Sequence, residues 1–164
     1  MNIFVLEDCP VKAAEVQCDK HVVKMIVESG QMLSTAHRML DGNLEVYINA
    51  NGRKARRYNL SDWRQQVLYK AVHYHHPCTV WTRESHENYN WHYEHFVALC
   101  EEYTYRYGKV HATDAKLRTM LKELPYKLCE ETMAVMNEKL AADMLSVFNR
   151  LQVIDGQDML KVAK

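Results

Sequence analysis

Glycine and proline are scarce in this chain, which has five glycines and three prolines among its 164 residues. Both residues mark turns and strand ends, so their scarcity argues against a fold of many short strands. Long stretches with helical periodicity are present instead. We therefore predict an all-α fold, a single compact domain over residues 1–164 with a short extended N-terminal lead at residues 2–6.

An excess of one charge is also absent, because 21 basic residues balance 21 acidic ones. General polyanion-binding proteins are usually basic, so non-specific duplex binding is disfavoured, although a local basic patch stays open. No apolar run approaches membrane-spanning length, and the N-terminus lacks the features of a signal peptide. We expect a soluble, cytoplasmic protein with no membrane partner, and the sequence leaves a homo-oligomer open.

Cysteine is present five times, an odd number, and no pair has the CxxC spacing. Reduced cytosolic thiols are therefore a simpler interpretation than a disulfide scaffold. The histidines of HYHHP (residues 73–77) and the pair His92 and His95 lack the converging ligand set of a zinc site. We expect no metal and no cofactor, and we find neither a phosphate-binding Gly-rich loop nor a nucleophile elbow.

Local signals place most helix boundaries. Pro10 indicates a short helix to about residue 17, and Asp19 is the expected N-cap of a long helix that Gly42 would end in a left-handed conformation. Ser85 is expected to cap a second long helix, which Gly108 would end. The remaining segments are predicted to be a polar loop at 43–60, a helix at 61–74, a short turn after Pro77, a helix from Thr113 to before Pro125, a helix at 129–151 and a tail at 154–164.

One face of the predicted helix at residues 19–41 is an unbroken polar stripe, while most other positions are apolar or small. A solvated face is one interpretation, since Lys24 and Glu28 are four residues apart and can pair. A polar face this narrow also indicates a helix surrounded by protein, where a glutamate can do acid/base work. Under this second interpretation Glu28 and His21 are the catalytic candidates, and the other stripe residues bind a ligand: Lys24, Gln31, Thr35 and Arg38.

Two further segments are candidates for anion binding. The segment GRKARRY (residues 52–58) carries four cations and is either a solvated loop or a phosphate-binding site formed by Arg53, Arg56 and Arg57. Arg83 and Asn88 lie near a predicted helix start, where an anion can bind. We include both in the predicted ligand-binding set.

Several segments resemble a family of small proteins encoded by tailed bacteriophages. The resemblance covers residues 1 to about 111, whereas residues 112–164 depart from the family pattern and are predicted to form divergent C-terminal helices. It implies a phage-encoded protein that acts in the host cytoplasm. The segments that carry it are MNIFVLEDCPVKAAE, CDKHVVKM, LSTAHR, HPC..W.RES..NY.W and L..EYTYRYGK.H.

The spacing of Asp19, His21 and Glu28 is similar to that of a motif in the phage pyrimidine-dimer DNA glycosylases, also called endonuclease V. Leu99, Glu102 and residues 106–108 are similar to a later helix of that family. The resemblance implies an endonuclease V-like helical fold, with Glu28 as the catalytic glutamate of a pocket that receives a base or nucleotide.

The chain also departs from the glycosylase pattern. That family uses the α-amine of an N-terminal threonine as a Schiff-base nucleophile, whereas residue 2 here is Asn2, which is too large for efficient removal of Met1. The lead before the helix is longer than in the family, and Gln31 occupies the position of a family arginine. The base-opening site is therefore expected to persist while the lyase chemistry is altered or lost.

Three functions follow as hypotheses. The first is a nucleic-acid or nucleotide-binding protein with a glycosylase-like pocket, and in its enzymatic form an N-glycosylase that acts on DNA bases. The second is a non-catalytic binder that sequesters a small nucleotide, for example a host immune signal, or recognises modified DNA. The third is an interaction protein whose polar stripe is only a surface. The sequence does not decide whether the protein is an enzyme.

Overall fold

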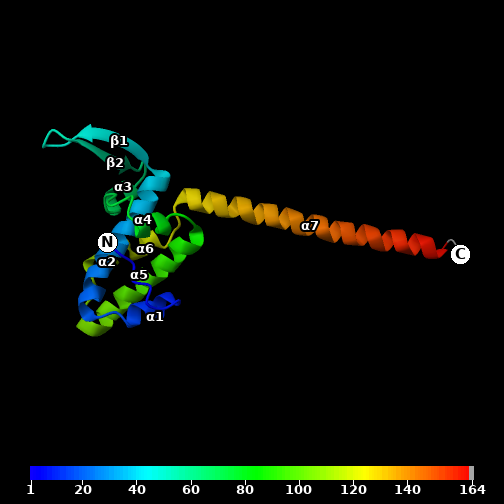
Figure 1. Ribbon diagram of the computed structural model, residues 1–164, viewed down its shortest axis with the longest axis horizontal. Coiled ribbons are helices and arrows are strands. Elements are labelled where there is room, and N and C mark those ends of the chain that lie inside the picture. Colours follow the sequence, from blue (N-terminus) through cyan, green and yellow to red (C-terminus); the bar gives the residue numbers. More distant parts are fainter. Residues whose placement is uncertain (163–164) are drawn as a thin grey trace. The chain divides into compact units, whose positions relative to one another are not determined.

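Helices α2 (Asp19–Asp41) and α5 (His86–Tyr107) pack against each other at the centre of the fold (Figure 1). The short helices α1 (Pro10–Glu15) and α4 (Pro77–Thr82) pack on this pair, and α6 (Ala112–Leu121) contacts both long helices. The computed structural model describes the backbone of residues 1–162 and the side chains of residues 1–146. The core between these helices is built from buried side chains that include Val22, Ile26, Leu33, Phe96, Leu99, Leu117 and Leu121.

The chain divides into two units, Met1–Cys129 and Glu130–Lys164. Helix α7 (Tyr126–Val162) begins in the first unit and forms the described part of the second. Its backbone is helical as far as Val162. The predicted helix end at residue 151 is therefore wrong, and so is the predicted tail for residues 154–162. Residues 163–164 lie outside the described part of the chain. Between 130 and 146 it exposes the apolar side chains of Met133, Val135, Met136, Leu140, Met144 and Leu145.

Within the described residues, no helix combines the length and the apolar composition that crossing a membrane requires. All five cysteines are free thiols. Burial raises the pKa of the Cys100 thiol well above its usual range, which makes this side chain an inert part of the core.

The ends of the two long helices test the predicted caps. For α5 the prediction is confirmed, since the Ser85 hydroxyl accepts a hydrogen bond from the Asn88 N–H (3.2 Å) and Gly108 is left-handed (φ 65°). For α2 the N-cap position is Cys18, with Asp19 as the first helical residue. Gly42 is extended (φ −97°), so the predicted left-handed cap is wrong. Glycine is needed there for close approach, because a Cβ would lie 2.4 Å from the Arg38 carbonyl oxygen.

The fold is mainly helical, as predicted, but it is not all-α. Residues 43–59, predicted as a loop, form an antiparallel hairpin of β1 (Asn43–Ile48) and β2 (Lys54–Asn59), in which Glu45 pairs with Arg57 and Val46 with Arg56. The Asn49 side chain accepts hydrogen bonds from the backbone N–H groups of residues 51 and 53 (both 3.0 Å) and closes the turn. Gly52 supplies the left-handed conformation (φ 71°) that this turn requires.

The predicted helix at 61–74 is also largely wrong. Only the four residues of α3 (Arg64–Val67) are helical, and Leu68 leaves the helix with an extended conformation (φ −69°, ψ 144°). Residues 68–76 then run without helix or strand to the start of α4. This irregular segment and the hairpin together form the walls of the groove described below.

Candidate functional site

The polar stripe of α2 is covered by other parts of the chain. At its N-terminal half, the Phe4 ring stacks on the His21 ring with 4.7 Å between centroids. One oxygen of the Glu28 carboxylate accepts a hydrogen bond from the Asn2 backbone N–H (3.0 Å) and lies 3.5 Å from the α-amino nitrogen of Met1. Lys24, whose ammonium is mostly exposed, lies 3.4 Å from the other oxygen. The N-terminal lead therefore packs on this half of the stripe and places the terminal amine at Glu28.

At its C-terminal half, the stripe organises the irregular segment. The buried Arg38 guanidinium donates five hydrogen bonds, all to neutral acceptors. The Thr35 hydroxyl accepts a hydrogen bond from the Val72 N–H (3.2 Å), and Gln31 supplies the carbonyl to which this hydroxyl donates (2.7 Å). The acceptors of Arg38 are the carbonyl oxygens of Tyr58 (3.0 Å), Gln65 (2.9 Å), Leu68 (3.0 Å) and Tyr69 (2.6 Å), together with the Gln65 side-chain oxygen (2.5 Å).

Arg38 is therefore committed to the fold. A guanidinium has five N–H donors, and all five have protein partners here. Burial lowers the pKa of this group, and its hydrogen-bond partners include no carboxylate. An arginine that carries a buried charge without a counter-ion makes the neighbouring surface attractive to anions.

A groove of about 530 Å³ lies between the hairpin and the irregular segment, and we call it the cationic groove. Lys116 of α6 completes its wall. None of its lining residues, all of which lie in the described part of the chain, is acidic. The lining contains five cations and three tyrosines: Arg38, Arg56, Arg57, Lys70 and Lys116, with Tyr47, Tyr58 and Tyr69.

The cations of the groove differ in how far they are already neutralised. Arg57 donates two hydrogen bonds to the Glu45 carboxylate (2.8 and 2.6 Å), and these bonds hold the pKa of Glu45 below its usual value. Arg56, Lys70 and Lys116 are exposed and form no ion pair with residues 1–146. The Lys116 ammonium lies 5.0 Å from the centre of the Tyr69 ring. These three cations are free to meet a bound anion.

The other predicted ligand residues lie apart from this groove. Arg53 is exposed at the hairpin turn and does not line the groove. The Arg83 guanidinium donates to the Thr79 carbonyl (2.9 Å), and the Asn88 side chain donates to the Trp81 carbonyl (3.0 Å). Arg83 and Asn88 therefore hold backbone carbonyls of α4. Among the described residues, no three His, Cys, Asp or Glu side chains lie close enough together to share a metal ion.

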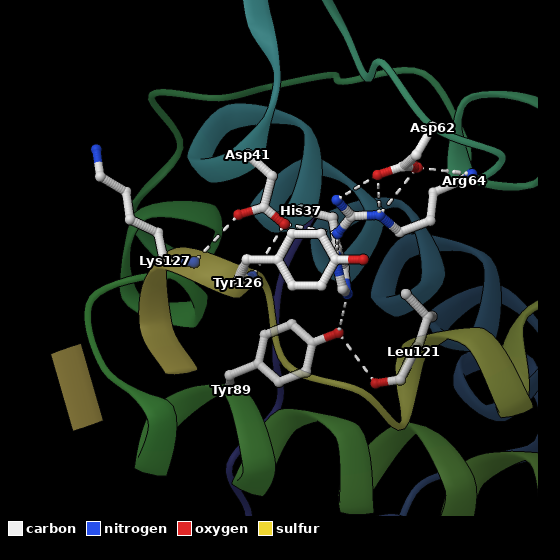
Figure 2. A network of polar contacts seen from close by, with 8 residues as sticks. All are labelled: His37, Asp41, Asp62, Arg64, Tyr89, Leu121, Tyr126 and Lys127. Atoms are coloured by element: carbon white, nitrogen blue, oxygen red, sulfur yellow. Dashed lines mark hydrogen bonds and ion pairs between the residues drawn. The ribbon is translucent and has the colours of Figure 1, made fainter. Parts of the chain in front are cut away.

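A buried polar network at the C-terminal end of α2 was not predicted from the sequence. Figure 2 shows Arg64 between the carboxylates of Asp41 (2.6 Å) and Asp62 (2.8 Å), with His37 beside it. The second partner of Asp41 is the start of α7, since its carboxylate accepts the backbone N–H groups of residues 126 and 127 (3.0 and 3.2 Å). This network ties α2, α3 and the first turn of α7 together.

The hydrogen bonds of the network define the protonation of His37. Tyr89 donates its hydroxyl proton to the Leu121 carbonyl (3.0 Å), so His37 Nε2 is the donor in its 2.8 Å bond with the Tyr89 oxygen. His37 Nδ1 then accepts from Arg64 (3.1 Å), which requires a neutral ring. Burial, with the nearby Arg64 charge as a smaller cause, lowers the pKa of His37 to about 4. The side chains of this network are hydrogen-bonded to one another inside the fold, and His37 and Arg64 also line a hollow of about 570 Å³.

Sequence reasoning missed Lys70, Lys116 and Tyr69 as groove residues. Lys116 lies in a helix more than forty residues along the chain from Lys70, and no local pattern links them. The hairpin did have a signal, since Asn51 and Gly52 are typical turn residues and follow a segment, residues 43–48, that is rich in residues with β propensity.

No protein-family model, curated protein or solved structure matches this chain. Function is therefore inferred from the geometry of the cationic groove and of the Glu28 site.

Proposed function

We propose that the protein binds a nucleotide or a single-stranded nucleic acid in the cationic groove. The observation that carries this proposal is the composition of the lining, five cations and three tyrosines with no acidic residue. Guanidinium and ammonium groups bind phosphate oxygens, and tyrosine rings stack on bases. The neutral net charge of the chain agrees with a local site for a single strand or nucleotide better than with general duplex binding.

Removing the free groove cations is expected to weaken binding. For the double variant Lys70→Ala/Lys116→Ala, we expect the Kd for fluorescein-labelled (dT)10 to rise roughly tenfold or more, because two phosphate contacts are lost. The slope of log K against log salt concentration should fall by about 1.4, since each phosphate contact to a single strand contributes about 0.7. Fluorescence anisotropy titrations at four salt concentrations measure both quantities.

Arg53→Ala/Lys54→Ala is the matched control, because it also removes two charges and because both residues are exposed cations of the hairpin that do not line the groove. It should change the Kd less than twofold. Equal losses in this control and in Lys70→Ala/Lys116→Ala would show that net charge, and not the groove, determines binding. Nucleotide that co-purifies with the protein, detected by mass spectrometry, would instead favour a sequestering function for the same groove.

A second candidate function is N-glycosylase chemistry, and the Glu28 site favours it. The α-amino nitrogen lies 3.5 Å from the Glu28 carboxylate, and the next backbone nitrogen, of Asn2, lies 3.0 Å from it. Removal of Met1 would therefore still leave an amine beside the same carboxylate. The resemblance to the pyrimidine-dimer glycosylases implies an amine nucleophile and a glutamate in these roles.

The position of Glu28 on α2 also fits this function. Glu28 and Arg38 belong to the same polar stripe, and the ten-residue step from one to the other corresponds to about 15 Å of helix. A strand bound in the cationic groove would therefore pass within a few nucleotides of Glu28. Its carboxylate could accept the proton that an attacking amine loses, or stabilise positive charge that develops on the sugar.

Glu28→Gln is expected to lower the rate of strand cleavage at an abasic site roughly 10²- to 10⁴-fold while the protein stays folded. Borohydride reduction should trap the wild type on abasic DNA through its N-terminal amine. Lys24→Gln is the control, because it removes the exposed partner of Glu28 and keeps the carboxylate; its cleavage rate should change only a few-fold. If the wild-type protein forms no adduct and cleaves no strand, the glycosylase proposal is contradicted and only the first proposal, binding in the cationic groove, remains.

A further inference from the structure

A second hollow of about 590 Å³ adjoins the cationic groove, and we call it the histidine pocket. It is lined entirely by residues 71–76, which include Tyr74 and three histidines. Ala71 and Val72 line both hollows, so the pocket continues the groove along the irregular segment.

Aromatic rings connect the two hollows. The ring of Tyr58, which lines the cationic groove, lies 5.7 Å from the ring of Tyr74 in the histidine pocket. The Tyr74 ring in turn lies 5.4 Å from the His75 ring. Tyr74 is half-buried and His75 is exposed. The rings meet edge to face, with interplanar angles of 67° and 78°, so each ring offers its own face to a base, and such stacking is tolerant of sequence.

The backbone of the histidine pocket is strained. His73 has a left-handed conformation (φ 47°), which a residue with a Cβ seldom adopts. Hydrogen bonds on both sides hold it there, from the Val72 N–H to the Thr35 hydroxyl (3.2 Å) and from the His76 N–H to the His73 carbonyl (2.9 Å). Strained residues of this kind concentrate at ligand-binding sites, where the surrounding fold keeps a required shape.

We infer that the cationic groove and the histidine pocket form one continuous site for a single-stranded nucleic acid of two or more nucleotides. Phosphates lie against Arg56, Lys70 and Lys116, and a base of the neighbouring nucleotide stacks on the exposed His75 ring, which contacts the Tyr74 ring edge to face. Two adjoining hollows of this size exceed what one nucleotide fills, so a free mononucleotide leaves one of them empty. This inference rests on the proposed function of the cationic groove and specifies its ligand.

Competition against fluorescein-labelled (dT)10 tests this inference. Unlabelled (dT)10 should compete at least a hundredfold better than dTMP, because a second nucleotide reaches the histidine pocket. His75→Leu and Tyr74→Leu should each weaken (dT)10 binding roughly tenfold, the loss expected for one base stack, and leave the dTMP affinity within twofold. His75 is exposed, so its variant keeps the fold if the more buried Tyr74→Leu does not. Tyr105→Leu is the control, since Tyr105 is 86% exposed elsewhere on the surface.

The outcomes separate this inference from the proposed function. Failure of both dTMP and (dT)10 to bind the wild type would contradict the proposed function itself. Binding of dTMP as tight as that of (dT)10 would keep a nucleotide site in the groove and overturn its extension into the histidine pocket. Wild-type affinity of the His75 and Tyr74 variants for (dT)10, or equal affinity for a ten-base-pair duplex, would overturn the extension as well.

Discussion

Arg38→Ala is expected to lower the free energy of unfolding by roughly 3–5 kcal/mol and to abolish binding in the cationic groove. The substitution removes five hydrogen bonds and takes this donor away from four backbone carbonyls, while the Gln65 side-chain oxygen keeps its bond from the Leu60 N–H (2.9 Å). Each buried acceptor left without a partner costs about 1–3 kcal/mol, and water that enters the space recovers part of this. Chemical denaturation measures the stability, and anisotropy with (dT)10 measures the binding.

Arg38→Lys separates charge from geometry at this position. An ammonium keeps the positive charge but has three donors and cannot reproduce the planar arrangement of the guanidinium. We expect it to lose most of the stability that the alanine variant loses. Arg53→Ala is a control, because Arg53 is an exposed arginine that does not line the groove, and it should change stability and affinity little. A lysine variant with wild-type stability and affinity would show that Arg38 acts through its charge alone.

Acidification from pH 6.5 to pH 4 is expected to destabilise the protein strongly. Burial lowers the pKa of His37 and His95 to about 4 and that of His92 to about 3, from an ordinary value of 6.5. Below pH 6.5 the unfolded chain takes up protons that the folded chain does not, so stability falls with pH. Stability continues to fall until the pH reaches the pKa values that these histidines have in the folded chain. Above pH 6.5 the stabilising contribution of the three histidines is fully present.

Three histidines that remain neutral in the fold give a slope of about 4 kcal/mol per pH unit near pH 5. Total stabilities of domains are about 5–15 kcal/mol, so we expect unfolding before pH 4. Urea denaturation at half-unit pH intervals measures this slope. His92→Phe should reduce it by about one third, because His92 is fully buried and its Nε2 has no hydrogen-bond partner in the described part of the chain. A stability independent of pH between 4 and 6.5 would contradict the neutral burial of these rings.

The long helices could be predicted because their signals are local. Ser85 and Gly108 satisfy backbone groups of α5 within one turn of each end, and Pro10 begins α1 for a similar reason. The polar stripe of α2 was also visible as a pattern. What covers it was not, since Phe4, the terminal amine and the irregular segment approach from distant parts of the chain.

The candidate site was predictable only in part. Glu28, Thr35 and Arg38 were identified as a set, and Arg56 and Arg57 as phosphate candidates. In the structure these residues have different partners. Glu28 lies beside the N-terminal amine, Arg38 donates its hydrogen bonds to backbone carbonyls, and Arg57 forms an ion pair with Glu45. Which cations remain free is a property of the folded chain, since it depends on which acceptors each one reaches.

By itself, the sequence determined the mainly helical class, the extents of α2 and α5 and the polar face of α2, because these follow from residue spacing and from caps within a few residues. Only the tertiary structure decided the path of residues 58–72. Local propensity predicts a helix at 61–74, in which the carbonyls of Gln65, Leu68 and Tyr69 would accept helical N–H groups. Arg38 takes these carbonyls and Thr35 binds Val72, so the segment leaves the helix after Val67 and forms the wall of the groove. The free-energy cost of leaving a buried guanidinium without acceptors is larger than the small helical preference of a short segment.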